Sequence, residues 1–142
     1  MRGTFSRGSR PLTDRNDRQS ARDLAITAAR VGDAKGATEV VVLEVGDVLV
    51  VADEFVIMSA PNDRLVKALV DEVEQVVRDG GGGSPLRVEG LDDRHWVLMD
   101  YGDVVVHVFL AETRQYYELE RLWADVPRLD WQEPAASRST GS

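Results

Sequence analysis

Hydrophobic and polar positions follow two different periods along the chain, and each change of period marks a predicted element. Apolar residues over 21–29 recur every three or four positions, which predicts a helix that ends within 32–36, where two glycines lie. The runs 40–45 and 48–51 are short and rich in valine, with a glycine turn between them, and predict a strand and its returning partner. We expect this second strand to resume over 55–59 after a kink.

A second helix is predicted after Pro61. Asn62 is a suitable N-cap and Asp63 lies in the favourable first turn. Between 65 and 77 the apolar positions line one face and the charged positions the other, as in a helix that covers a sheet. The glycine-rich segment 79–85 then predicts a flexible link.

The second half of the chain predicts three strands and a helix. The strands span 86–89, 95–100 and 104–109, and the helix spans 112–123. The apolar run from residue 104 predicts a central strand that is covered on both faces. The resulting order, α-β-β-α-β-β-β-α, predicts a single α/β (α+β) domain, with a mixed sheet of about five strands flanked by helices.

The ends of the chain lack a usable hydrophobic period. We expect a disordered tail over 1–18, a folded domain over 19–124, and a largely disordered extension over 125–142. No apolar stretch approaches the roughly 20 residues of a membrane helix, and the start lacks the apolar core of a secretory signal. The expectation is a soluble, cytoplasmic protein that does not contact membranes.

Charge and residue type restrict the function further. The formal net charge is −8, and because residues 1–20 carry +3, the rest of the chain carries −11. Such a surface repels phosphate backbones, so we expect a basic protein partner and no direct sequence-specific binding of nucleic acid. The absence of cysteine excludes disulfides and thiol catalysis, and two histidines leave a zinc site short of ligands. We expect neither a metal nor a cofactor.

Two sequence patterns resemble phosphate-binding sites but lack the flanking residues and elements that such sites require. The glycines at 80–83 lack the lysine of a phosphate-binding loop, and they follow a predicted helix where that loop follows a strand. Ser84 with Asp92 and Asp93 loosely matches nucleotidyltransferases, which hold two metal ions with paired carboxylates. Here the carboxylates do not alternate along a strand. A small nucleotidyltransferase-like, nucleotide-binding enzyme stays as the alternative function.

A serine hydrolase would need His95 or His107 together with Ser59 or Ser84. The chain has no nucleophile elbow of the Gly-x-Ser-x-Gly type. His107 lies within a run of valines, which is typical of a hydrogen-bonded residue in a sheet. We therefore predict no catalytic residues.

Aromatic and acidic residues gather near one predicted turn. In an alternating strand, Trp96, Leu98 and Asp100 share one face, with Tyr101 and Asp103 in the turn that follows. Tryptophan and tyrosine flanked by carboxylates are typical of an interface with a basic partner. The opposing interpretation, a tryptophan buried beneath the C-terminal helix, is equally compatible with the sequence.

The residues in these segments resemble the ribosomal silencing factor (Iojap-related) family. The resemblance rests on the runs 53–64, 96–107 and 117–123, in matching order and spacing, and covers about 23–123. The run from Trp96 to His107, with its Asp-Tyr-Gly-Asp centre, carries most of it. Glu54 departs from the family pattern, which has Tyr or Cys there.

This resemblance implies a nucleotidyltransferase-like fold without catalytic residues. It also implies binding to the large (50S) ribosomal subunit through its L-fourteen protein, which blocks joining of the small subunit and represses translation when nutrients are limited. The implied contact residues are Trp96, Leu98, Asp100, Tyr101, Asp103 and Arg64. A homodimer through the same surface is a further expectation.

Overall fold

The computed structural model describes the backbone of residues 11–47, 49 and 52–132, and its elements follow the predicted order. In chain order they are α1 (Pro11–Lys35), β1 (Thr38–Glu44), β2 (Glu54–Ala60), α2 (Asp63–Asp79), β3 (Arg87–Glu89), β4 (Trp96–Asp100), β5 (Val104–Leu110), α3 (Ala111–Tyr117), α4 (Leu119–Leu122) and β6 (Arg128–Leu129). No described helix, including the 25-residue α1, has the length and apolar character that crossing a bilayer requires.

The six strands form one mixed sheet in the order β3-β4-β5-β2-β1-β6. β2 and β5 are parallel, in register from Glu54 opposite Val104 to Ala60 opposite Leu110. The other neighbouring pairs are antiparallel. The prediction of a mixed α+β domain is confirmed.

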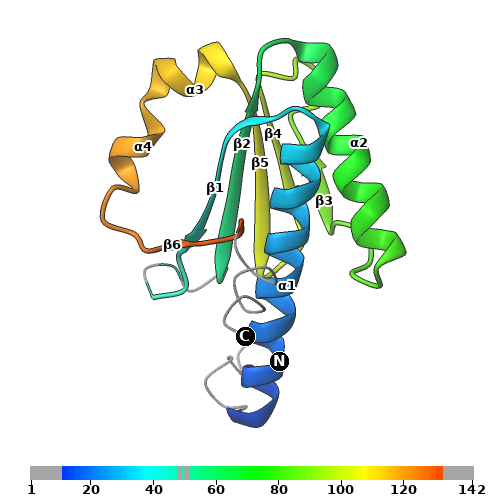
Figure 1. The fold of residues 1–142 in the computed structure, drawn as a ribbon, viewed down its shortest axis with the longest axis vertical. Coiled ribbons are helices and arrows are strands. Elements are labelled where there is room, and N and C mark those ends of the chain that lie inside the picture. The colour runs from blue at the N-terminus through cyan, green and yellow to red at the C-terminus, as the bar shows by residue number, and fades with distance from the viewer. Residues whose placement is uncertain (1–10, 48, 50–51, 133–142) are drawn as a thin grey trace, which may run out of the picture.

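One face of the sheet lies beneath α1 and α2, which run side by side across it (Figure 1). Alanines of α1 and valines of α2 meet alternate residues of β2, β4 and β5 in a continuous buried core. The predicted N-cap is confirmed, because the Asn62 side chain accepts a hydrogen bond from the Leu65 amide over 2.8 Å. Burial of this face supplies most of the apolar contact that stabilises the domain.

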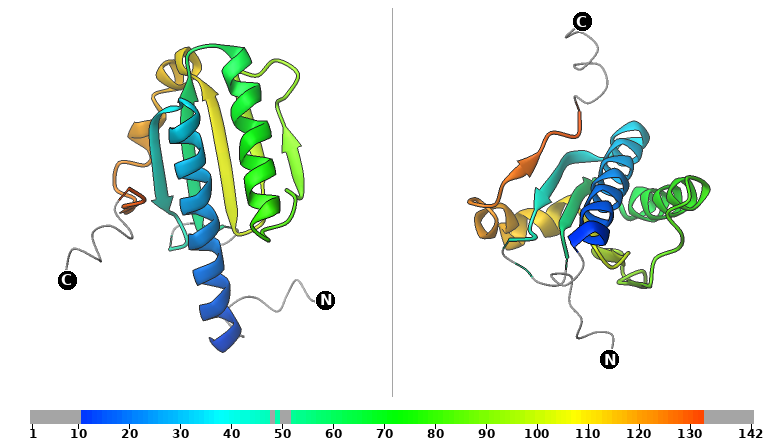
Figure 2. Two further views of the ribbon diagram at one scale, coloured as in Figure 1. Left: turned by 45° about the vertical axis from the view of Figure 1, so that its right-hand side comes forward. Right: turned by 90° about the horizontal axis from the view of Figure 1, so that it is seen from below.

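The opposite face is covered over only part of its width. The segment that contains α3 and α4 lies on that side (Figure 2), and Trp123 and Val126 close a smaller core with Leu43, Ile57 and Phe109. β5 is nearly buried on both faces, as predicted. On this second face, however, side chains of neighbouring strands cover part of β5.

The structure corrects the predicted boundaries at both ends. Residues 11–18, expected to be part of a disordered tail, belong to α1, and residues 1–10 lie outside the described residues. Within the expected extension, β6 pairs with β1, and buried Trp131 donates its indole N–H to the Val40 carbonyl over 3.2 Å. A two-residue strand is too short to show a hydrophobic period.

Two internal details also differ from the predictions. β2 begins at Glu54, and of the segment 48–51, where the strand was expected to start, only residue 49 is described. The predicted helix over 112–123 is broken at Glu118, which has a left-handed backbone with φ of 49°. This break turns α4 away from the axis of α3.

Candidate functional site

The partly covered face of the sheet presents the side chains predicted for a contact surface. On β4, Val97 and Met99 are fully buried beneath the helices, whereas Trp96, Leu98 and Asp100 alternate toward the other face. We call the surface formed by Trp96, Leu98 and Asp100, with Tyr117 of α3 beside Trp96, the open face. The predicted division of β4 into two faces is confirmed.

Trp96 is held in a defined orientation but remains 39% exposed. Its ring packs on Phe109 with centroids 4.7 Å apart and faces Tyr117 at 6.1 Å. Its indole N–H donates a hydrogen bond to His107 Nδ1 over 3.1 Å. α3 therefore borders this tryptophan without burying it, which contradicts the interpretation that Trp96 lies beneath the C-terminal helix.

His107 is buried and serves as the acceptor that orients Trp96. Desolvation lowers the pKa of His107 from 6.5 to about 4, so the ring is neutral at physiological pH. Because Nδ1 accepts from Trp96, the ring proton lies on Nε2, for which the described part of the chain offers no hydrogen-bond partner. This geometry serves orientation, and it does not form a serine–histidine pair.

Gly90 allows the loop before β4 to approach Trp96 closely. Its φ is +91°, and a Cβ placed there would collide with the Trp96 carbonyl oxygen. The Arg94 amide donates to the Gly90 carbonyl over 3.0 Å and closes the loop. A glycine at this position thus fixes the start of β4.

Asp100 ends β4 and stabilises the turn to β5. One carboxylate oxygen accepts from the Gly102 amide over 2.8 Å, and the other lies 3.3 Å from Arg87 Nε. The Asp100 carboxylate therefore interacts with both the turn and β3.

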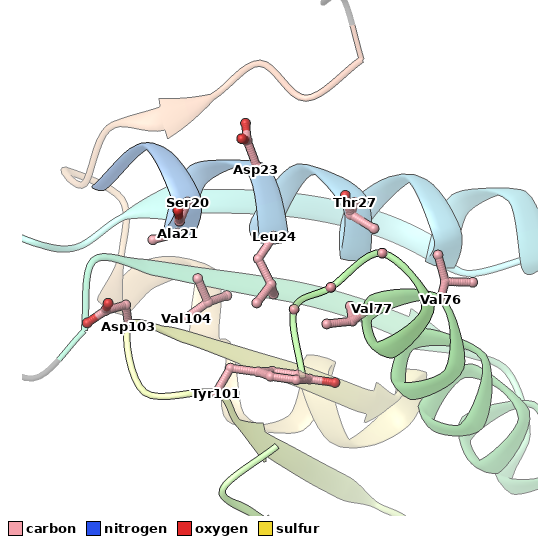
Figure 3. Close-up of a pocket in the computed structure, with 13 residues that line it drawn as sticks. Ser20, Ala21, Asp23, Leu24, Thr27, Val76, Val77, Tyr101, Asp103 and Val104 are labelled. Carbon is pink, nitrogen blue, oxygen red and sulfur yellow. The ribbon is translucent and has the colours of Figure 1, made fainter. Parts of the chain in front are cut away.

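Tyr101 and Asp103 lie on the other side of the sheet from Trp96. Both line a pocket of about 430 Å³ at the α1–α2 side, where Leu24 and Val77 point toward the Tyr101 ring (Figure 3). Burial, and then the nearby Glu74, raises the pKa of Tyr101 to about 12, and its hydroxyl has no hydrogen-bond partner among the described residues. Tyr101 and Asp103 therefore lie away from the open face, and their role as contact residues stays a prediction.

Arg64 lies at the opposite end of the sheet from the Tyr101–Asp103 turn. It is exposed in the first turn of α2, next to Asp63, whose carboxylate lies 4.0 Å from Arg94 of the loop before β4. Since β4 runs away from this end, Arg64 is far along the strand from Asp100. Three of the six predicted contact residues thus share one surface.

α3 contributes two exposed tyrosines that were not among the predicted contact residues. Tyr116 and Tyr117 are 78% and 53% exposed and pack against each other edge to face, with centroids 5.0 Å apart. The predicted helix over 112–123 includes both tyrosines but does not place them beside Trp96. The helix breaks at Glu118, and no glycine marks the break.

The candidate catalytic side chains are engaged elsewhere. Ser59 is buried, and its hydroxyl accepts from Arg114 Nη1 over 2.8 Å. Ser84 is exposed in the link that leads into β3. Among the side chains that the structure describes, His, Asp and Glu form no group of three that could hold a metal ion.

The Arg114 side chain fastens α3 to the sheet. It is buried, and it also donates to the Glu39 carbonyl over 2.7 Å at the irregular start of β1. This anchor sets the position of Tyr117 beside Trp96.

Comparison with known proteins decides the family. The family model described as "Ribosomal silencing factor during starvation" matches residues 18–142, nearly the whole chain. This chain belongs to the ribosomal silencing factor family. A ribosomal silencing factor of Bacillus subtilis is 41% identical over 72% of this chain and 86% of its own length.

Two further relatives extend this result. A mouse protein named for mitochondrial assembly of the ribosomal large subunit is 33% identical over 71% of this chain and 44% of its own length. A crystal structure of a Chromobacterium violaceum protein superposes with a TM-score of 0.69 at 27% identity, covering 82% of this chain and 95% of that protein. The family predicted from the runs 53–64, 96–107 and 117–123 is confirmed, and this silencing-factor domain has the fold of its structural neighbour.

Proposed function

We propose that this silencing factor binds the large ribosomal subunit through its L-fourteen protein, using the open face. The observation that carries the proposal is Trp96, which is oriented by His107 and Phe109 yet presents more than a third of its surface to solvent. A rigid, half-exposed aromatic ring is typical of an interface hot spot. Leu98 and Asp100 continue the same surface along β4.

The mechanism we propose is occlusion. One domain seated on the large subunit excludes the small subunit from that area, which represses translation, especially when nutrients are limited. Occlusion needs no turnover, cofactor or nucleotide. The domain would act in the cytoplasm, and its formal net charge of −8 favours association with a basic ribosomal protein.

Co-sedimentation with purified large subunits tests this proposal. Trp96→Ala should weaken binding by about 2–4 kcal/mol, at least thirtyfold, while the protein stays folded. The matched control is Leu86→Ala, which removes another exposed apolar side chain outside the open face and should pellet like the unmodified protein. Equal pelleting of both variants would contradict the assigned surface.

A subunit-joining assay tests occlusion itself. Added before small subunits, the protein should reduce the fraction of joined ribosomes in a sucrose gradient, and Trp96→Ala should restore it. Joining that proceeds unchanged at saturating protein would contradict occlusion. Nucleotide with Mg²⁺ should leave the melting temperature unchanged, whereas the enzyme alternative predicts a rise.

Self-association through the open face is part of the same proposal. A dimer formed there would have to dissociate before the ribosome could bind. Mass measurement with and without large subunits tests this, because a dimer that persists on the subunit would place the dimer contact elsewhere.

A further inference from the structure

The open face continues at its Trp96 end into a pocket of about 670 Å³. Three elements contribute to it: the loop before β4 provides Asp93, β4 provides Trp96, and α3 provides Glu112, Tyr116 and Tyr117. The pocket is therefore lined chiefly by aromatic rings and carboxylates. This combination suits a positively charged ligand.

The three aromatic rings lie close together at inclined angles, and Trp96 also packs on Phe109 with centroids 4.7 Å apart. The Trp96 and Tyr117 rings are inclined by 51° with centroids 6.1 Å apart, and Tyr116 meets Tyr117 nearly at right angles. The negative π-face of an aromatic ring attracts a cation within about 6 Å of its centre, and tryptophan does so best. Trp96 lines the pocket and is 39% exposed, so part of its ring is accessible to a cation there.

The charge of the pocket is negative among the described residues that line it. Asp93 and Glu112 are exposed carboxylates, and no lysine or arginine is among these residues. Of the nearby arginines, Arg94 reaches toward Asp63 at 4.0 Å, and Arg114 is buried against the Glu39 carbonyl and Ser59. His95 also lines the pocket, and its Nδ1 lies 3.9 Å from an Asp93 oxygen.

We infer that this pocket accepts one arginine side chain from the protein partner that covers the open face. A guanidinium is planar, so it can stack on Trp96 and still donate hydrogen bonds to a carboxylate, which a compact ammonium cannot do equally well. The inference rests on the proposed function for the source of the arginine. It adds a defined receptor for one basic side chain.

A small probe tests the pocket without the ribosome. N-acetylarginine amide, titrated into the folded protein, should shift the indole N–H signal of Trp96 saturably in a ¹H–¹⁵N spectrum. Trp96→Phe identifies that signal among those of the three tryptophans. N-acetylcitrulline amide has nearly the same shape without the charge, and it should cause no saturable shift.

Paired variants connect the probe to the carboxylates. Asp93→Asn with Glu112→Gln keeps the shape of both side chains and should weaken probe binding at least about fivefold by removing the charges. Asp92→Asn is the matched control, since it removes the neighbouring charge outside the pocket and should leave probe binding unchanged. Citrulline binding equal to arginine binding, or no loss in the double variant, would overturn the inference.

Large-subunit pelleting separates the two proposals. If Trp96→Ala abolishes pelleting while the double variant pellets normally and the probe does not bind, the open face is correct and the arginine pocket is wrong. If the probe binds as expected but the unmodified protein does not pellet with large subunits, the pocket is correct and the proposed function fails. A lysine probe that binds more tightly than the arginine probe overturns the choice of guanidinium.

Discussion

The two faces of the sheet carry different residues because helices cover one face and leave part of the other exposed. Beneath α1 and α2, valine, alanine and methionine side chains interlock with almost no exposure. On the other face, β4 leaves Trp96 and Asp100 at least partly exposed, and both side chains carry polar atoms. Small aliphatic residues pack densely in a core. Aromatic residues with polar edges tolerate contact with solvent and can also pack against a partner that covers them.

Removing a leucine side chain from each face tests this difference most directly. Leu69→Ala, on the buried side of α2, should lower the free energy of unfolding by about 3 kcal/mol, because it leaves a cavity in the core. Leu98→Ala, on the half-buried open face, should cost below about 1 kcal/mol. Urea unfolding measures both, and equal losses would show that the open face is part of the core.

The anchor of α3 should show the next largest effect. Arg114→Ala leaves the Glu39 carbonyl and the buried Ser59 hydroxyl without this donor, which should cost about 2 kcal/mol of stability. It should also weaken large-subunit binding, since Tyr117 loses its fixed position. Arg121→Ala is the control, because Arg121 is exposed and pairs with the exposed Glu118, so its loss should change stability by below about 1 kcal/mol.

The two faces should respond to pH in opposite directions. Burial, reinforced by Asp53, raises the pKa of Glu54 from 4.5 to about 7 on the helix side, although Arg22 opposes the shift. Stability from Glu54 is therefore complete below pH 4.5 and is lost as the pH rises toward 7. His107, whose pKa is lowered from 6.5 to about 4, acts conversely, and stability is lost as the pH falls from 6.5 to 4.

Unfolding measured across pH 4–8 separates these two contributions. Because the two windows overlap, the opposing contributions largely offset each other in the unmodified protein between pH 4.5 and 6.5. Glu54→Gln should remove the falling contribution and leave stability that rises with pH between 4 and 6.5, whereas His107→Asn should leave stability that falls between 4.5 and 7. If neither variant changes the slope, these groups do not set the pH dependence of stability.

The smallest expected effect concerns the hydrogen bond behind Trp96. Trp96→Phe keeps an aromatic ring but leaves His107 Nδ1 without its donor, which should cost about 1 kcal/mol of stability. Large-subunit binding should fall less than in Trp96→Ala, because the ring contact remains. If Phe and Ala weaken binding equally, the indole N–H rather than the ring contact determines affinity.

The fold was largely predictable because its signals are local. The period of 65–77, the N-cap at Asn62 and the valine-rich strands each specify their element within a few residues. Errors arose where the signal was short or distant, as in β6, which is formed by two residues whose pairing with β1 depends on the folded sheet. The break at Glu118 likewise carries no glycine or proline to mark it.

For the site, alternation along β4 placed Trp96, Leu98 and Asp100 on one face correctly, since a strand fixes the direction of successive side chains. The turn residue Tyr101 was misplaced because the period of two ends with the strand. The amino-acid sequence by itself determined the family, the element order and the composition of each face. Only the tertiary structure decided which face stays uncovered and which side chains border Trp96, because strand order and the position of α3 depend on contacts such as Arg114 with Glu39, far apart in the chain.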